Sequence, residues 1–559
     1  MVLFITGMPY ALSQDIISPV QNEKTKPNIL LIVADDLGYT DLGAYGGEIK
    51  TTNLDALAAS GVKLTNFHTA PACSPTRASL LTGVEHHLAG LGTMHQEWDE
   101  NQLGQPGYEG FLNSSVVTIA ELLKNSGYMT YMAGKWHLGK SSEQTPDARG
   151  FEQSFALLEG GASHFSDQAG LAESASVTYQ ENGHVVDLPD DFYSSKYYTD
   201  KLIEYIGEGK ALKKPFFAFA AYTAPHWPLQ VPNDYLELYA GKYDQGYSQL
   251  RRSRIARMKQ IGLIEQSFKL NDDEAEAAWN SLNPQQKKIA SKQMEIYAAM
   301  VEYLDEQVGR LIDHLRDINQ LDNTVIIFMS DNGAEGNDIS HLSNNKEWLP
   351  KAFDNSLKNM GKENSYVFTG PYWAQASVGP FRLFKGFSSE GGIRAPAIIS
   401  YQGLTPIKQQ TEQFISVLEI APTILDLAGV THPGTLYQGR KIHPASGKSL
   451  VPYLTGQETS VLQNVPIGTE LFGRRAITRD NWKLVWMCQP YGEGRWQLFD
   501  LSKDLQELHD LSSKHTSIVS SLLKSWESYV NDNGIILPQS GDSGYAKSPE
   551  IAKQACSKL

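Results

Sequence analysis

The sequence predicts an α/β fold built on a mostly parallel sheet, followed by a smaller antiparallel sheet with a helix. Continuous apolar runs occupy residues 28–34, 215–220 and 324–329, as expected for strands that helices cover on both faces. Segments with helical patterns lie between these runs, which is the alternation typical of α/β proteins. After about residue 456, short strand-like runs joined by polar turns replace this alternation.

Two helices are predicted with clear limits. Residues 115–124 form one, with Ser114 or Ser115 as its cap, and residues 292–315 form a long amphipathic one. The wider range 233–320 is strongly helical and charged, and we interpret it as a solvated excursion from the α/β body. Residues 341–376 resemble a loop rich in Asn, Trp and Tyr, and we expect them to help wall a pocket.

The chain is expected to divide into a large and a small domain. The small domain contains four predicted strands, at 468–471, 475–478, 482–486 and 496–499, and a helix at 517–530. The predicted organisation is a leader at 1–26, a catalytic domain at 27–455, and a small α+β domain with a polar tail at 456–559.

Composition excludes some partners and gives a weak indication of location. The 559 residues carry a formal net charge of -15, which argues against nucleic acid or an anionic membrane as a general partner. The apolar N-terminal stretch is too short to span a bilayer, and no other segment is typical of an integral membrane span. Ala11 and Ser13 fit a signal-peptidase site, although no Lys or Arg precedes them. We therefore expect a periplasmic or secreted protein, with a cytoplasmic one as the alternative.

Cysteine is scarce. The chain has Cys73, Cys488 and Cys556 and no others, so at most one disulfide can form within it. If Cys73 is modified, Cys488 and Cys556 are the only possible pair.

Acidic residues follow two of the predicted strands. Asp35 and Asp36 come directly after the first strand, and Asp331 and Asn332 follow the strand at 324–329. The C-terminal ends of parallel strands are where α/β sheets place ligands, and adjacent carboxylates repel unless a cation lies between them. These four oxygen-bearing side chains suit Ca²⁺, with Mg²⁺ as the alternative. Each motif alone could also be an ordinary Asp-rich turn.

Cations and imidazoles occur in three further segments. Lys135 and His137 are two residues apart, so in an extended segment they lie on the same face. His226 lies in a Pro-stiffened turn after the run at 215–220, and Lys385 precedes a Gly-rich segment. A lone Lys-x-His is more often surface decoration, but flanking glycines and Trp136 favour a site here.

The run Cys73-Ser74-Pro75-Thr76-Arg77 closely resembles the signature of type I sulfatases. Further motifs of that family are VADDLG, CSPTRASLLTG, MAGKWHLG, APHWPLQ, MSDNGAEG and EGGIRAPA. The resemblance covers about residues 27–535 and is strongest to the soluble bacterial arylsulfatases. It implies the fold of the alkaline phosphatase superfamily, a large mixed sheet between helices with a smaller C-terminal sheet.

The resemblance also implies roles for particular residues. Cys73 is expected to be oxidised to formylglycine by a separate maturation enzyme, and Asp35, Asp36, Asp331 and Asn332 to bind calcium. The remaining polar site residues that match the family are Arg77, Lys135, His137, His226 and Lys385.

A mechanism follows as a hypothesis. One hydroxyl of the hydrated aldehyde attacks the sulfur of a small-molecule sulfate ester, and loss of a proton from the other expels sulfate. Lys135 and the metal would neutralise the sulfate oxygens, while Arg77 holds the hydrate and the metal ligands in register. Asp331 would accept the attacking hydroxyl's proton. His137 would be the base for collapse of the hemiacetal. The pair His226 and Lys385 would stabilise or protonate the leaving oxygen.

Two other functions remain open at this point. The nearer is a phosphonate monoester or phosphodiester hydrolase of the same superfamily, and the more remote is a non-catalytic binding protein. The Trp and Tyr residues between 347 and 373 favour an aromatic or otherwise flat substrate, unless they serve only for packing.

Overall fold

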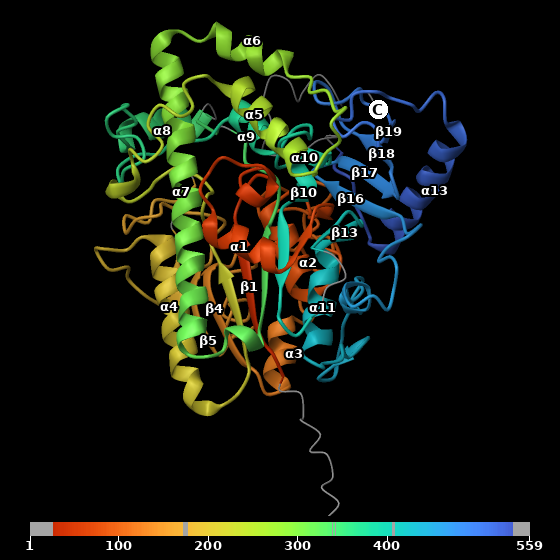
Figure 1. Cartoon of the computed structure of the whole chain (residues 1–559). Coiled ribbons are helices and arrows are strands. Elements are labelled where there is room, and N and C mark those ends of the chain that lie inside the picture. Colours follow the sequence, from red (N-terminus) through yellow and green to blue (C-terminus); the bar gives the residue numbers. More distant parts are fainter. Residues whose placement is uncertain (1–25, 172–176, 338, 341–342, 405–408, 540–559) are drawn as a thin grey trace, which may run out of the picture.

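The computed structural model describes residues 26–171, 177–337, 339–340, 343–404 and 409–539. Most of the predicted leader at 1–26, the end of the polar tail, and Cys556 lie outside these ranges. The main feature is a ten-stranded sheet with the order β12-β2-β11-β9-β1-β8-β4-β5-β6-β7, which runs through the larger part of the molecule (Figure 1). Its strands are β1 (Asn28–Ala34), β2 (Val62–Leu64), β4 (Met129–Lys135), β5 (Gln153–Leu157), β6 (Tyr179–Glu181), β7 (His184–Val185), β8 (Phe216–Ala221), β9 (Thr324–Ser330), β11 (Ala397–Ser400) and β12 (Gln410–Thr411).

The pairing makes this sheet mixed but mostly parallel at its centre. The neighbours β9, β1, β8, β4 and β5 are all parallel to one another. Antiparallel pairings join β11 to β9 on one side and β6 to β5 on the other. The fold class predicted from the sequence is therefore confirmed.

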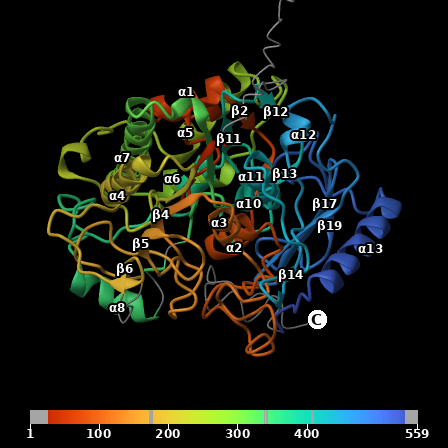
Figure 2. The ribbon, with the colours of Figure 1, turned by 90° about the horizontal axis from the view of Figure 1, so that it is seen from below.

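Helices cover both faces of the sheet, which explains why its central strands are apolar throughout. In β1, Leu30 and Ile32 belong to one core cluster, whereas Ile29 and Leu31 belong to another on the opposite face. The first face is covered by α1 (Thr52–Ser60), α4 (Ser194–Gly209) and α7 (Pro284–Asp317), as Figure 1 shows. The second is covered by α2 (Cys73–Thr82), α3 (Ile119–Asn125) and α11 (Ile420–Leu427), which Figure 2 shows from below.

One predicted helix begins later in the structure, and the predicted excursion is partly buried. The segment 115–124 is helical only from Ile119, because Thr118 and Glu121 form a capping box there. The range 233–320 is not a solvated excursion throughout, since α7 buries Met294, Leu304 and Val308 in the main core. Only α5 (Tyr247–Gln260) and α6 (Asp273–Ser281) precede α7 as full α-helices in this range.

Short elements complete the larger part. The segment 341–376, predicted as a loop, contains α8 (Ser343–Ala352) and α9 (Pro371–Ser377). The remaining elements there are β3 (Phe67–His68), β10 (Arg394–Ala395), β13 (Ile415–Ser416), β14 (Leu436–Tyr437), β15 (Arg440–Lys441), α10 (Glu390–Ile393), α12 (Val451–Leu454) and the short 3-10 helices at Gly43–Tyr45, Lys210–Leu212, Asn233–Tyr235, Leu321–Asn323 and Val417–Glu419.

A four-stranded antiparallel sheet follows, as predicted. Its strands run in sequence order and carry one long helix, at the right of Figure 1 in blue. The elements are β16 (Ile467–Leu471), β17 (Arg474–Arg479), β18 (Trp482–Trp486), β19 (Gln497–Asp500) and α13 (Thr516–Asp532). Ile477 and Leu484 pack against Leu522 and Trp526 of that helix. Among the helices of the described ranges, none is both long enough and apolar enough to cross a membrane.

Candidate active site

The residues singled out from the sequence meet at the C-terminal edge of the central parallel strands. Each lies at the end of a strand, in the turn after a strand, in α2, or in the loop before α10. Asp35 and Asp36 follow β1, Asp331 and Asn332 follow β9, Lys135 ends β4, His226 follows β8, and Cys73 begins α2. This edge is where ligands are expected in α/β sheets.

Arg77 fixes the helix that carries Cys73. It lies four residues after Cys73 on α2, and its guanidinium is fully buried. Its Nη2 lies 2.8 Å from Asp331 Oδ2, its Nε donates to the same oxygen at 3.0 Å, and its Nη1 donates to the Lys135 carbonyl at 3.0 Å. Cys73 itself is 2% exposed, and burial is the main cause that raises the pKa of its thiol.

Buried lysines contact the carboxylates that follow β1. Lys135 Nζ lies 2.6 Å from Asp35 Oδ2, and Lys385 Nζ lies 2.8 Å from Asp36 Oδ1. Lys385 also contacts Glu335, at 3.2 Å from its Oε2. Sequence reasoning did not single out Glu335, although the motif MSDNGAEG contains it and its spacing from Asp331 could have been noticed.

The carboxylates of the site fit a hard divalent cation. Burial raises the pKa of Asp35 and Asp331, and that of Asp36 to about 6, although neighbouring lysines oppose the shift. Asp35 Oδ1 and Asn332 Oδ1 are buried with no hydrogen-bond partner in the described part of the chain. Buried oxygen atoms without a hydrogen bond are costly unless something binds them, and oxygen is the ligand that Ca²⁺ and Mg²⁺ prefer.

Both imidazoles of the site are held in the neutral form. His226 Nδ1 lies 2.5 Å from the Trp227 carbonyl, which can only accept, so Nδ1 carries the proton and Nε2 faces Asp36 Oδ2 at 3.5 Å. Burial, reinforced by Lys385 and Lys135, places the pKa of His226 well below its usual value. Burial, Lys135 and Arg77 do the same to the pKa of His137.

Gly160 makes room for His137. A β-carbon on Gly160 would lie 2.6 Å from Cε1 of the His137 ring, closer than such contacts allow. The glycine therefore lets the loop after β5 approach the imidazole.

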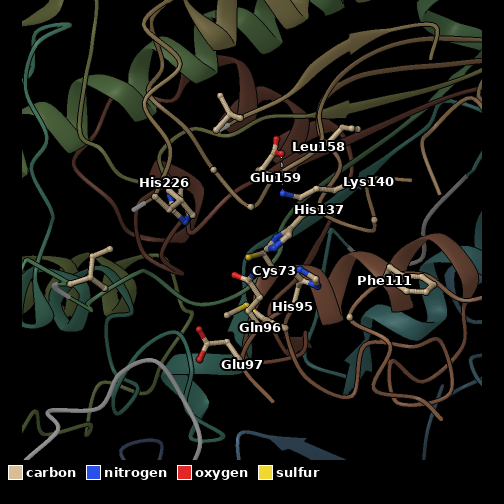
Figure 3. Close-up of a pocket in the computed structure, with 18 of the residues that line it drawn as sticks. Cys73, His95, Gln96, Glu97, Phe111, His137, Lys140, Leu158, Glu159 and His226 are labelled. Carbon is tan, nitrogen blue, oxygen red and sulfur yellow. Dashed lines mark ion pairs between the residues drawn. The ribbon is translucent and has the colours of Figure 1, made fainter. Parts of the chain in front are cut away.

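A cavity of about 500 Å³ opens above these groups, with Cys73, His137 and His226 on its inner wall (Figure 3). Its apolar lining consists of Met94, Phe111, Leu158, Leu171, Val177, Trp227 and Ile339. A polar part of the lining contains His95, Gln96 and Glu97, together with the ion pair between Lys140 and Glu159 at 3.0 Å. The loops at 94–97 and 158–161 carry no recognisable motif, so a sequence pattern could not single them out.

The aromatic residues between 347 and 373 do not line this cavity. Trp373 and Tyr366 are buried in the main core, and Trp348 packs against it. The suggestion that these side chains face a flat substrate is therefore wrong, and the packing alternative holds. Asn345, from the segment expected to wall the pocket, does line the cavity.

Comparison with known proteins extends these observations. The model of the sulfatase family matches residues 27–430, and that of the C-terminal region of N-sulphoglucosamine sulphohydrolase matches residues 379–531. An uncharacterized sulfatase of Schizosaccharomyces pombe is 43% identical over 92% of this chain and 95% of its own length. An arylsulfatase of Klebsiella aerogenes is 39% identical over 77% of this chain and 92% of its own. Among solved structures, Ps i-CgsB in complex with k-i-k-neocarrahexaose is 24% identical with a TM-score of 0.64, over 94% of this chain and 96% of that one.

Proposed function

This chain belongs to the sulfatase family and is a sulfuric ester hydrolase, and on that premise we propose that it cleaves aryl sulfates with a formylglycine derived from Cys73. One observation carries the proposal. Cys73 lies at the N-terminus of a ten-residue helix, at the inner end of a cavity, within 4.8 Å of carboxylate oxygens of Asp35 and Asp331. A helix N-terminus and buried cations favour the binding of an anion such as sulfate.

Formation of the aldehyde requires an oxidation that this chain does not perform. The Cβ–S bond of Cys73 breaks, water supplies the aldehyde oxygen, and sulfur leaves as sulfide. Two electrons pass to an oxidant used by a separate maturation enzyme. Water then adds to the aldehyde and leaves two hydroxyls on one carbon.

In the first chemical step, one of these hydroxyls forms a bond to sulfur while the bond from sulfur to the phenol oxygen breaks. Asp331 would take the hydroxyl proton, because one of its carboxylate oxygens lies within 4.8 Å of the sulfur of Cys73. Lys385 is the better proton donor to the phenol oxygen, since His226 is neutral and its Nε2 carries a lone pair. Of the two roles expected for this pair, stabilising or protonating the leaving oxygen, protonation therefore falls to Lys385.

In the second step, neutral His137 takes the proton of the remaining hydroxyl. The C=O bond re-forms, the bond from carbon to the sulfate oxygen breaks, and sulfate leaves with the electron pair. Asp35, Asp36, Asp331 and Asn332 would hold the divalent cation, which supplies positive charge to the sulfate oxygens. Lys135, whose ammonium group is buried against Asp35, would add to that charge.

The cavity favours a largely apolar alcohol or phenol. Phe111, Leu158 and Trp227 offer contact area to an aromatic ring and few hydrogen bonds to sugar hydroxyls. We therefore place aryl sulfates ahead of sulfated sugars as substrates.

Two measurements test the proposal. The mass of the peptide that contains residue 73 should correspond to the aldehyde in active enzyme, and Cys73→Ala should lower turnover at least 10⁴-fold, on the order seen for loss of a nucleophile. An unmodified thiol in fully active enzyme would contradict the aldehyde chemistry. Aryl sulfate should be cleaved faster than the matched aryl phosphonate; the reverse preference would favour the phosphonate monoester hydrolase instead.

A further inference from the structure

A second group of metal-ligating side chains lies away from the active site, where the loop after α2 meets the C-terminal sheet. It consists of Glu85, His86 and His87, all buried. The cavity beside it is about 240 Å³ in volume and is lined by Glu85 and His86. The residues lining this cavity and those lining the active-site cavity do not overlap.

Two separations between the candidate ligand atoms match those of a tetrahedral metal site. Glu85 Oε1 lies 3.5 Å from His86 Nε2 and 3.3 Å from His87 Nδ1. One ligand atom from each of the three residues lies within 4.8 Å of the other two. Ligands about 2.0 Å from a tetrahedral zinc ion are separated by roughly 3.3 Å.

The other nitrogen of each imidazole is already engaged. His86 Nδ1 lies 2.7 Å from the Leu91 carbonyl, and His87 Nε2 lies 2.9 Å from Glu470 Oε2. A carbonyl can only accept, so Nδ1 of His86 carries its proton and Nε2 presents a lone pair to Glu85. Metal-binding histidines have this arrangement, with the second nitrogen held by a carbonyl or a carboxylate.

A proton explains only one of the two contacts of Glu85. It can lie between His87 Nδ1 and Glu85 Oε1, which are 3.3 Å apart. The lone pair of His86 Nε2 faces the same carboxylate oxygen at 3.5 Å, because the proton of that ring is on Nδ1. A cation placed among the three atoms satisfies both imidazoles at once.

We propose that Glu85, His86 and His87 bind a zinc ion between the α/β body and the C-terminal sheet. Two nitrogens and one carboxylate oxygen suit Zn²⁺ better than Ca²⁺, which takes six to eight oxygens. The adjoining cavity gives the ion a path and leaves space for a water as fourth ligand. Glu470 in β16 orients His87, and Tyr529 in α13 hydrogen-bonds Glu85 Oε1 at 2.5 Å. The ion would therefore connect the larger part of the chain to both layers of the smaller one.

The test is a zinc titration of the full chain by equilibrium dialysis, with excess Ca²⁺ present to occupy the active site. It is run in the Cys73→Ala background, because the thiol with Asp35 and Asp331 offers zinc a competing set of ligands. One zinc per chain should bind, and His86→Gln and Glu85→Gln should each weaken it at least 100-fold. His184→Gln, at an exposed position, is the matched control and should leave binding unchanged.

Two further readouts separate a zinc site from a folding effect. With Cys73 intact, His86→Gln should keep the aryl sulfatase turnover of the wild type, because His86 does not line the catalytic cavity. Co²⁺ bound to the Cys73→Ala chain should show the intense visible absorption of tetrahedral coordination. The proposal is overturned if the Cys73→Ala chain binds no more zinc than the chain that also carries His86→Gln. An octahedral spectrum of bound Co²⁺ overturns it as well. Either result counts even if a variant folds poorly.

Discussion

Two groups of buried charged side chains in this protein differ in how well their charges balance. Beside the C-terminal sheet, Glu390 and Glu507 share Lys483, at 2.8 and 2.9 Å, and Glu390 is also contacted by His68 and Arg394. In the active site, the cations Arg77, Lys135 and Lys385 contact four carboxylates, those of Asp35, Asp36, Asp331 and Glu335.

The pKa values respond accordingly. Burial would raise the pKa of Glu390, but Lys483 and His68 outweigh it and hold that pKa well below the usual value. Glu507, which has to share Lys483, has a raised pKa because burial dominates. In the active site the pKa values of all three Asp carboxyls are raised. The first group is mostly complete within the protein, whereas the second is suited to receive one more cation.

The largest expected effect comes from breaking the balanced group. Lys483→Met would leave Glu390 and Glu507 buried without their shared partner, and the free energy of unfolding should fall by about 3–5 kcal/mol. Lys503→Met is the control, because that side chain is 81% exposed, and its loss should cost less than about 1 kcal/mol. Urea denaturation measures both; equal effects would mean that the Lys483 group contributes no more than a surface ion pair.

Chelation should act on the unbalanced group alone. If the site binds a divalent ion held at 100 to 1,000 times its Kd, removing that ion lowers the free energy of unfolding by about 3–4 kcal/mol. Thermal unfolding with and without chelator measures this. All variants are compared in the His86→Gln background, so that an ion at Glu85, His86 and His87 does not contribute. There Asp36→Asn should no longer respond, whereas Glu507→Gln should respond as fully as the parent chain. A chelator effect that survives in Asp36→Asn would assign the ion to other ligands.

The two groups also differ in how their imidazoles are surrounded. His68 stacks on Phe414 at 4.2 Å between ring centroids, whereas His137 depends on the absence of a side chain at Gly160. Gly160→Ala should push His137 out of position and lower kcat about 100-fold, the usual cost of a shift near 1 Å. Gly207→Ala in α4, whose added carbon meets its nearest atom at 4.0 Å, should leave kcat unchanged. Wild-type kcat in Gly160→Ala would show that His137 has room to adjust.

The smallest expected effect is the pH dependence of stability, which has opposite signs in the two groups. The pKa of Asp36 is raised to about 6 without metal, so its contribution to stability is present at low pH and is lost as pH rises through 6. The pKa of Glu390 is depressed, so its contribution is present above about pH 4.5 and is lost as pH falls below that value.

Cation binding at pH 5 should therefore release about one proton, and at pH 8 almost none. The affinity should rise about fivefold between pH 5 and 6, and about twofold more above pH 6 before it levels off. Calorimetry in buffers of different ionisation enthalpy counts the protons, and Asp36→Asn should release fewer. Release that is constant from pH 5 to 8 would be inconsistent with a raised pKa at Asp36.

The elements that the sequence predicted best are those with a strong repeat or a motif. The run Asn28–Ala34 is a strand at the predicted residues because helices cover it on both faces and it is apolar throughout. The cap of α3 was misplaced, since Ser114, Ser115 and Thr118 are all good caps and only the tertiary structure decides among them. Trp373 was ambiguous for a related reason: an aromatic side chain suits a pocket wall and a core equally well. The side chains that line the active-site cavity, such as Phe111, come from loops without periodicity, and only the folded chain brings them together.

The burial of Cys73 limits when this residue can be modified. With 2% of its surface exposed and Arg77 anchoring its helix, the thiol offers no approach to another protein once α2 has docked on the sheet. If residue 73 is to become an aldehyde, the conversion has to come before the fold closes. Each chain then has a single early opportunity to mature, and a chain that folds first stays permanently inactive, however well it is folded.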